Sequence, residues 1–445
     1  MGVLDGRGPF NHGSLIAHNR PALKKGTSAL STGLRRVGGI LRGLCLGLAV
    51  GASSLTPVAN AAGVTITVTQ ELEAARPGAI VSVPFKQIDA AAPGLRMYHV
   101  VVRDPKGRVL PSQVTNYQHD HRGASYDDLV FPYDFAAGQK RAVFTVESVA
   151  AATAPEKPCA YARFIPERLD DMAWENDRIA HRMYGATLNS EVAAAVGERL
   201  RGSGIDVWAK KVTYPIVDRW YAKGHDQFHK DGEGEGLDLY SIGGARGAGG
   251  TGVWDGKKLW TSDNFATAQV LANGPRRAAF KLSYAPFDAG SGQVTETKQF
   301  TVDCGVNFDA VESVFDFPGA EGIVGIGLTQ HKLGEGFPAA VITRDPDGRW
   351  LSIWEESKDG GVGVAAILAP GTESPGIVSD GPDERGVTNH LLLVKAADGA
   401  PVRYFTGAGW DKSGQFKGRA EWETYVRNFA AGVARPLTVT VSARP

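Results

Sequence analysis

Short segments in which apolar and polar residues alternate constrain this chain more than any other feature of its sequence. Region 64–148 holds six of them, from VTITVTQ at 64–70 to RAVFTVES at 141–148, with turns between them. A period of two places alternate side chains on opposite faces of a strand. The chain also has 56 glycines and 24 prolines, which are typical of many turns. This region therefore predicts a small antiparallel β-sandwich, with domain bounds 62–150.

Longer strands are expected beyond an Ala/Pro-rich linker, AAATAPEKP, at 150–158. VTETKQFTVDCGVNFDAVESVFDF at 294–317 and NHLLLVKA at 389–396 belong to a series of strands, several of which are too long for an immunoglobulin-sized sandwich. They favour large stacked antiparallel sheets within a second domain, 159–445. The final segment, PLTVTVSA, is expected to be a closing strand.

Two helices interrupt this mainly β pattern. SEVAAAVGERLRG begins with Ser190, which is a suitable N-cap for a short helix. In RAEWETYVRNFAAG, the apolar residues recur at i, i+3, i+4 and i+7, as one face of a helix requires. The expected fold class is thus mainly β with a few short helices.

Residues 1–61 differ from the rest and have the three parts of an export signal. Arginines 35, 36 and 42 flank an apolar run at 44–55, and Ala59-Asn60-Ala61 matches an A-x-A cleavage site. The run is too short for a stable membrane anchor. We expect removal of this leader, a mature chain that starts near Ala62, and a periplasmic or extracellular location.

The charge of the expected mature chain bears on its partners, and its two cysteines bear on a disulfide. The first 61 residues hold seven of the 48 basic residues and one of the 48 acidic residues, so the remainder carries a net charge of about −6. A nucleic-acid partner would need a basic face, so none is expected, and no second apolar stretch is long enough to span a membrane. Cys159 and Cys304 remain, as a disulfide or as two buried thiols.

Five stretches carry a resemblance to a known family: LPSQV, DDLVFPYDFAAGQK, MAWENDRIAHRMYG, HKDGEGEGLDLYSIGGARGAGGTGVWDGKKLW and GAGWDKSG. They resemble a bacterial secreted domain family of unknown function whose members are often found among polysaccharide-degradation genes. The resemblance covers most of the mature chain. It implies a large β-supersandwich, similar to galactose mutarotases and several polysaccharide lyases, behind a small β domain. This chain departs from the pattern at YQHDHRGASY, where relatives tend to carry an Asp/Gly-rich turn.

The stretch GHDQFHKDGEGEGLDLYSIGGARGAGG at 224–250 is the first candidate site. His225 and His229 have the i, i+4 spacing of zinc ligands on a helix, but the glycines around them break a helix. No Lys-Ser or Lys-Thr follows the glycines, which argues against a phosphate-binding loop. A catalytic loop without metal or cofactor is favoured over a solvated connection, because long unstructured loops are uncommon in compact domains.

The second candidate is AWENDRIAHRMYG. Interpreted as one strand, it places five residues on one face, namely Trp174, Asn176, Arg178, Arg182 and Tyr184. Aromatic rings, an amide and guanidinium groups suit a cleft for acidic sugars. The alternative is a solvent-facing strand with cross-strand ion pairs.

Other polar residues receive weaker roles. Trp410 and Lys412 in GAGWDKSG are expected at the rim of the cleft. His331 and His390 lie beside apolar strands and are expected to be structural. Glu355 and Glu356 are adjacent, so only one of them can enter a cleft from a strand.

These residues fit an enzyme that acts on uronic-acid-containing oligo- or polysaccharides. β-Elimination needs a cation for the carboxylate, a base and an acid. The candidates are, in that order, Arg178 or Arg182, His229 or His225, and Tyr240 or Tyr184.

A glycoside hydrolase is the first alternative and needs two carboxylates. The candidates are Asp231, Glu233, Glu235 and Asp238, of which Asp231, Glu233 and Asp238 are also expected to contact substrate in the lyase. A non-catalytic carbohydrate-binding protein is the second alternative. The histidines, the arginines and the family resemblance favour the lyase.

Export is directly testable. Mass spectrometry of the protein from its native host should find a mature N-terminus near Ala62, because the signal is removed during transport. Recovery of the full-length chain from the cytoplasm would contradict this expectation.

Overall fold

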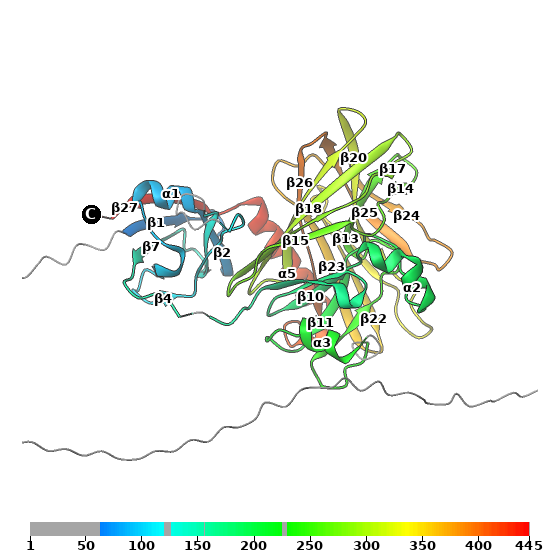
Figure 1. Cartoon of the computed structure of the whole chain (residues 1–445), viewed down its shortest axis with the longest axis horizontal. Coiled ribbons are helices and arrows are strands. Elements are labelled where there is room, and N and C mark those ends of the chain that lie inside the picture. Colours follow the sequence, from blue (N-terminus) through cyan, green and yellow to red (C-terminus); the bar gives the residue numbers. More distant parts are fainter. Residues whose placement is uncertain (1–62, 120–125, 155, 225–228, 445) are drawn as a thin grey trace, which may run out of the picture. The chain divides into compact units, whose positions relative to one another are not determined.

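The computed structural model describes residues 63–119, 126–154, 156–224 and 229–444. Within these residues the chain is mainly β and forms five antiparallel sheets, as expected from the alternating sequence (Figure 1). The helices among them are α1 Phe85–Ala91, α2 Glu191–Ala195, α3 Val217–Lys223 and α5 Arg419–Ala434, with 3₁₀ turns at Met97–His99, Pro166–Arg168, Ala186–Asn189 and Asp411–Ser413. No described helix is both long and apolar enough to cross a membrane.

The N-terminal part is a sandwich of two sheets. One has the order β27-β1-β7-β3-β4 and the other β2-β6-β5. Their bounds are β1 Gly63–Thr69, β2 Arg76–Pro84, β3 Val100–Arg103, β4 Val109–Leu110, β5 Gln113–Val114, β6 Asp128–Phe135, β7 Arg141–Ser148 and β27 Thr438–Ala443. In β1 the buried residues Val64, Ile66 and Val68 alternate with more exposed ones, so the sequence period becomes the two faces of the sheet.

The last strand of the described chain completes the first sheet. β27 pairs with β1 in antiparallel register, from Val64 opposite Ala443 to Thr69 opposite Thr438. PLTVTVSA therefore forms the expected strand, but it pairs with a strand of the region 62–150 and not with the sheets that precede it in sequence.

A second five-stranded sheet follows the linker and carries four of the candidate residues, Trp174, Arg182, Asp238 and Tyr240. Its order is β12-β11-β10-β9-β8, so each strand lies beside its neighbour in sequence. We call it the meander sheet. Its strands are β8 Tyr161–Ile165, β9 Asp171–Glu175, β10 Ile179–Met183, β11 Asp206–Lys210 and β12 Gly236–Tyr240.

The segment that we expected as one strand, AWENDRIAHRMYG, is a hairpin of β9 and β10 in this sheet. The side chain of Asn176 accepts hydrogen bonds from the backbone N–H groups of Arg178 (2.8 Å) and Ile179 (3.1 Å), which turns the chain. His181 lies opposite Trp174, and Arg182 lies opposite Ala173. Trp174 and Arg182 therefore occupy opposite faces of the sheet, and the predicted shared face is wrong.

Two larger sheets build the rest of the fold. One has the order β14-β13-β20-β25-β24, and the other runs β15-β16-β18-β19-β26-β23-β22-β21 with β17 beside β18. The bounds of the first are β13 Ala248–Trp254, β14 Leu259–Trp260, β20 Glu321–Gln330, β24 Gly376–Asp380 and β25 Thr388–Ala397. Those of the second are β15 Thr267–Ala272, β16 Arg277–Ser283, β17 Phe287–Asp288, β18 Gln293–Asp303, β19 Phe308–Asp316, β21 Val341–Arg344, β22 Trp350–Ser357, β23 Gly360–Leu368 and β26 Pro401–Trp410. The largest apolar cluster draws side chains from these two sheets and from the inner face of the meander sheet.

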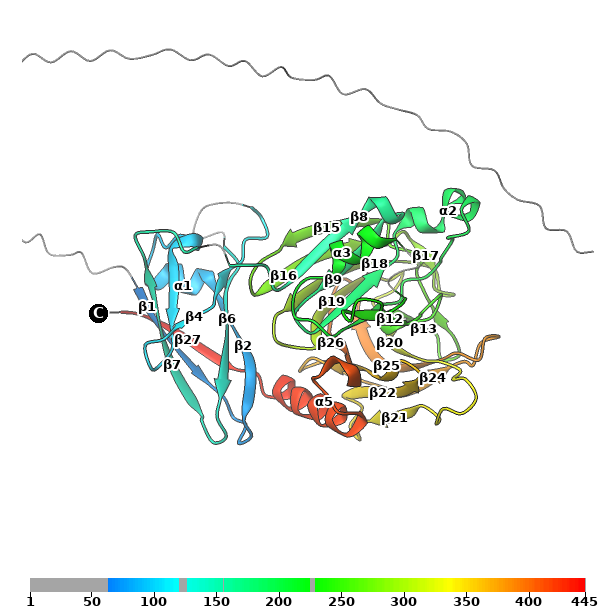
Figure 2. The same ribbon diagram turned by 90° about the horizontal axis from the view of Figure 1, so that it is seen from below.

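Both predicted helices are present. Ser190 caps α2 and accepts a hydrogen bond from the backbone N–H of Ala193. α5 lies along β22 and β23 (Figure 2). Its residues Trp422 and Val426 are buried against Phe308 and Trp350, so the helical spacing of apolar residues does mark the packed face.

Cys159 and Cys304 form a disulfide with a Cα–Cα distance of 6.0 Å. It connects the start of the meander sheet to the segment after β18, across 145 residues of sequence. The carboxylate of Asp177 lies beside the two sulfurs, but both sulfurs are already covalently bonded to each other and do not form a thiolate site.

Removal of this disulfide should destabilise the fold. Replacement of both cysteines by alanine should lower the free energy of unfolding by about 2–5 kcal/mol, since the crosslink restricts a long loop of the unfolded chain. Urea denaturation of the oxidised protein and of the variant measures the difference. An unchanged midpoint and slope would show that the crosslink contributes nothing.

Candidate functional site

One face of the meander sheet carries an unusual number of ionisable side chains. The registers of β9 to β12 place Glu175, Trp208 and Lys210 on the same side as Arg182 and Asp206. We call this the polar face and define it by its charged residues, Asp171, Glu175, Arg182, Asp206, Lys210 and Asp238. All six are buried, each with at most 4% of its surface exposed.

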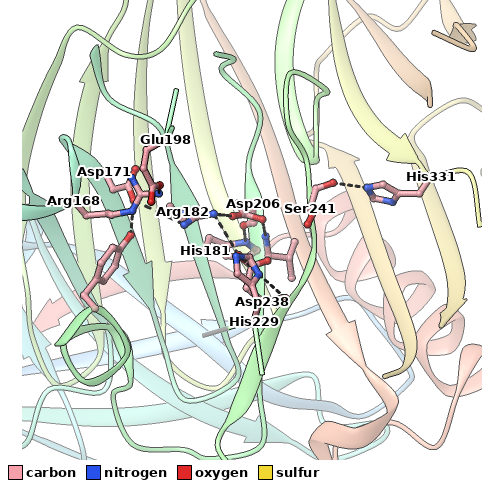
Figure 3. Close-up of polar contacts among 12 residues, drawn as sticks. Arg168, Asp171, His181, Arg182, Glu198, Asp206, His229, Asp238, Ser241 and His331 are labelled. Carbon is pink, nitrogen blue, oxygen red and sulfur yellow. Dashed lines mark hydrogen bonds and ion pairs between the residues drawn. The ribbon is translucent and has the colours of Figure 1, made fainter. Parts of the chain in front are cut away.

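Arg182 lies at the centre of the polar face. Its Nε and Nη2 donate to Asp206 Oδ2 at 3.0 and 2.6 Å, and Nη2 also reaches Asp238 Oδ2 at 3.3 Å (Figure 3). Nη1 lies 4.0 Å from Asp171 Oδ2. The guanidinium carbon is 5.2 Å from the ring centre of Tyr184, so the cation is enclosed by acids and an aromatic ring.

Three carboxylates around one guanidinium leave negative charge uncompensated, and protons relieve it. Burial raises the pKa of Asp238 well above its usual range, the charge of Asp206 raises it further, and Arg182 opposes the rise. Burial likewise raises the pKa of Asp171 to about 6, against the charges of Arg182 and Arg168. Tyr221 donates to Asp171 Oδ2 at 3.0 Å.

His229 connects this buried cluster to the surface. Its Nδ1 lies 3.5 Å from Asp238 Oδ2 and 3.4 Å from the Asp238 carbonyl oxygen. Its side chain is 36% exposed, whereas that of Asp238 is 1% exposed. Figure 3 shows the imidazole beside Asp238 and Arg182. The histidine thus places one ring edge on a buried carboxylate while part of the ring faces solvent.

Glu175 attaches α3 to the polar face. Its carboxylate accepts from Lys210 Nζ at 2.6 Å and from the backbone N–H groups of Ile216 and Val217 at 2.8 Å. These N–H groups begin α3 and have no partner within the helix. Trp220 of α3 then packs against Trp208 of the sheet, with ring centres 5.3 Å apart.

The acids of the glycine-rich stretch attach its described part to α3. Glu235 accepts from Tyr214 Oη at 2.9 Å, Arg219 Nε at 2.8 Å, Trp220 Nε1 at 3.1 Å and Lys223 Nζ at 3.3 Å. Burial acts to raise its pKa, but these hydrogen bonds outweigh burial and lower it.

Two further acids of this stretch are also paired. Glu233 pairs with Lys223 at 2.7 Å, and Asp231 pairs with Lys211. At Gly236, where φ is 121°, a Cβ would lie 2.0 Å from the Ala209 carbonyl oxygen, so close backbone approach requires the glycine. Residues 229–236 are therefore a connected part of the fold, and they carry His229 to the polar face.

The structure separates the residues expected on one strand. Trp174 is fully buried on the inner face of the sheet, and its Nε1 donates to Asp309 Oδ2 at 2.7 Å. Asn176 and Arg178 lie in the hairpin turn, where the Asn176 amide donates to the carbonyl oxygens of Asp303 and Val306. The Arg178 side chain is 39% exposed beside Asp177.

The remaining predicted residues lie beside the polar face, in the core or at the surface. Tyr184 lies beside Arg182, as expected for a shared face. Tyr240 is buried in the core and donates to the Thr329 carbonyl oxygen. Trp410 is 1% exposed, with its Nε1 bonded to the Asp359 carbonyl oxygen, and Lys412 is exposed. His225 lies outside the described residues.

The sequence interpretation missed four of the six charged residues of the polar face. Asp206, Trp208 and Lys210 alternate along DVWAK, and Asp171 and Glu175 alternate along DMAWE. Both segments carry polar residues at a period of two in otherwise apolar strands, which is the available signal. Their burial under α3 could not be inferred from that period.

Two substitutions distinguish the roles of the acids. Asp206→Asn should destabilise the fold by about 3–5 kcal/mol, because it leaves Arg182 without its main buried partner. Asp238→Asn should cost much less at any pH below the raised folded pKa of Asp238, since the carboxyl is protonated there in the folded state.

The raised pKa of Asp238 determines the direction in which folding stability changes with pH. A raised folded pKa makes wild-type stability fall as pH rises from about 4, the unfolded value, through the folded value. Asp238→Asn should remove that part of the fall, which thermal unfolding between pH 4 and 9 measures. An unchanged pH profile in Asp238→Asn would contradict the assigned protonation.

Comparison with known proteins gives a family and no described activity. The chain is 35% identical over 288 residues to "Uncharacterized protein P7" from Formosa agariphila, an alignment that covers 63% of this chain and 69% of that protein. Two solved structures from Enterococcus faecalis resemble the fold with a TM-score of 0.44: a protein in the glycosyl hydrolase family 38 (10% identity) and an α-mannosidase (9%). Each alignment covers 86% of this chain and spans only about half of the other protein, 48% and 46%.

The family match covers most of the described chain. It extends over residues 68–439, from β1 to β27, and so includes the polar face, α3 and the glycine-rich stretch. The expected resemblance to a family of unknown function is confirmed at this level. The chain belongs to the family described as "Domain of unknown function (DUF4861)".

Proposed function

We propose that this protein is an exported enzyme that cleaves uronic-acid-containing oligo- or polysaccharides by β-elimination, with His229 as the base. The observation that carries the proposal is the contact of a partly exposed imidazole with a buried carboxylate, His229 Nδ1 to Asp238 Oδ2 at 3.5 Å. A histidine oriented by a carboxylate is a common general base, because the carboxylate holds one ring nitrogen and leaves the other for the substrate.

β-Elimination requires a particular protonation state of Asp238 and of His229. When Asp238 is ionised and accepts the Nδ1 proton, Nε2 of His229 can remove the proton from C5 of the uronate. The electrons of that C–H bond form the C4–C5 double bond, the C4–O bond breaks, and the leaving oxygen takes a proton from water. Because burial raises the pKa of Asp238, the competent state forms only as pH rises through that raised pKa, so activity should increase with pH over that range.

The substrate carboxylate needs a cation to acidify the C5 proton. Arg182 is enclosed by Asp206 and Asp238, so we assign it a positioning role. Arg178 precedes β10 and Lys211 follows β11 at the same end of the meander sheet, and Lys412 lies two residues after Trp410, which Lys211 contacts. Gln415 bonds the Arg178 carbonyl at 3.2 Å, and Lys211 Nζ lies 5.3 Å from the Trp410 ring. We propose that this group of cations holds the substrate carboxylate.

The carboxylates proposed for a hydrolase have other partners. Asp231, Glu233 and Glu235 each pair with a Lys or Arg side chain, and Asp238 is buried. A glycosidase needs one such group to reach the leaving oxygen and another to reach water or the sugar. This arrangement supports the lyase over the hydrolase.

His229→Ala should reduce turnover by roughly 10²-fold to 10⁴-fold with little change in substrate affinity or melting temperature, the usual loss of a general base. The assay uses acidic and neutral oligosaccharides and records both reducing ends and the ultraviolet absorbance of an unsaturated uronate. Glu191→Gln, which changes an exposed acid of α2 that has no proposed role in the site, is the control and should retain activity.

The assay also distinguishes the alternatives. Reducing ends without absorbance would replace the lyase by a hydrolase. Measurable affinity without either product would indicate a binding protein. Full turnover by His229→Ala would remove this histidine from the mechanism.

A further inference from the structure

His331 has hydrogen-bond acceptors at both ring nitrogens. Nδ1 lies 2.8 Å from Glu355 Oε2, and Nε2 lies 2.7 Å from the Ser241 carbonyl oxygen (Figure 3). The backbone N–H of His331 donates to the other Glu355 oxygen at 2.6 Å. An ionised carboxylate and a carbonyl can only accept, so the ring satisfies both contacts only when both nitrogens carry protons.

His390, a second histidine in this part of the fold, provides an internal contrast. Its Nε2 faces the Gln330 side-chain oxygen at 2.7 Å, whereas its Nδ1 faces the hydroxyl of Ser379 at 3.0 Å and a guanidinium nitrogen of Arg344 at 3.5 Å. A guanidinium only donates, so Nδ1 must accept and the ring is neutral. Burial and the charge of Arg344 lower the pKa of His390, in agreement with this geometry.

The groups that face His331 come from four elements. Glu355 belongs to β22. Tyr240, in β12, packs edge-on against the His331 ring, with the two ring centres 4.6 Å apart, and the Ser241 carbonyl follows β12. The positive charge of Arg385, from the turn before β25, opposes protonation. Burial also lowers the pKa of His331, but the hydrogen bond and charge of Glu355 outweigh both and raise it above its ordinary value.

We propose that His331 is held as an imidazolium at neutral pH and that this cation is a pH-sensitive positioning residue, which fixes the end of β12 to β22. β12 carries Asp238 three residues before Ser241, so loss of the second ring proton releases one end of the strand that supports His229. We call the three-way contact of Ser241, His331 and Glu355 the histidine clamp.

The clamp has a defined sign of pH dependence. A histidine whose folded pKa is raised stabilises the fold fully below its unfolded pKa, near 6.5, and the contribution is lost as pH rises through the folded pKa. The fold should therefore weaken on the alkaline side of neutrality. This prediction stands apart from the proposed function, and only its effect on turnover rests on that function.

Nitrogen-15 NMR of the histidine rings tests the protonation directly. In the wild-type protein at pH 7, His331 should show two protonated ring nitrogens and His390 one. Glu355→Gln keeps an acceptor oxygen but removes the charge, so it should move the His331 titration to lower pH and leave that of His390 unchanged. A neutral His331 at pH 7, or an unmoved titration in Glu355→Gln, would overturn the proposal.

Thermal unfolding gives a second measurement that needs no substrate. The wild-type melting temperature should fall between pH 6.5 and 9 more steeply than that of His331→Gln, which cannot titrate. Equal slopes would show that the clamp does not contribute.

Turnover separates this proposal from the proposed function. A selective loss of wild-type turnover at alkaline pH that Glu355→Gln moves to lower pH would support positioning through β12. If no lyase activity is found but the NMR and melting results hold, the clamp remains and only the proposed function fails.

Discussion

Charge balance on a buried sheet face is the constraint on which the rest of this structure depends. The polar face holds four carboxylates against Arg182 and Lys210, and α3 excludes water from it. Burial of an uncompensated charge costs several kcal/mol, so the face is stable only if protons or outside groups make up the difference. Raised pKa values at Asp171 and Asp238 supply protons, and His229 touches the cluster where it meets the surface. The same imbalance that the fold must tolerate thus creates a site that can exchange a proton with a ligand.

The cover over this face also explains why the glycine-rich stretch is rich in acids. Glu175 accepts hydrogen bonds from backbone N–H groups at the start of α3. Glu235 accepts from four side-chain donors of α3 and the segment before it. Without these two carboxylates, α3 would have to remain on the sheet mainly through Trp208 and Trp220. The glycines allow tight backbone approach, and the acids fix the path. This combination places His229 beside Asp238, although residues 229–235 have no regular secondary structure.

Periodicity predicted the strands well, because a period of two maps directly onto two faces of a sheet. The period of two predicted that Val64, Ile66 and Val68 share one face of a strand. The helical spacing of Trp422 and Val426 predicted the packed face of a helix. It failed at Asn176, whose side chain accepts hydrogen bonds from the backbone N–H groups of Arg178 and Ile179 and so reverses the chain inside an apparently continuous pattern. The site could be predicted only in part from the sequence, for the same reason. His229, Arg182, Tyr184 and Asp238 were predicted individually, but their meeting depends on registers and on α3, which no local pattern encodes.

The pairing of β27 with β1 has a consequence for the order of assembly. One edge of β1 stays open until β27 has been synthesised and, if the chain is exported, carried across the membrane. Contacts so distant in sequence form late, because the chain must first lose the entropy of closing the intervening loop. The open edge of β1 is meanwhile a template for unwanted strand pairing. A chain that lacks β27 would therefore lose order first in its N-terminal sheet, and its quality control in the cell would depend on whether β27 has paired.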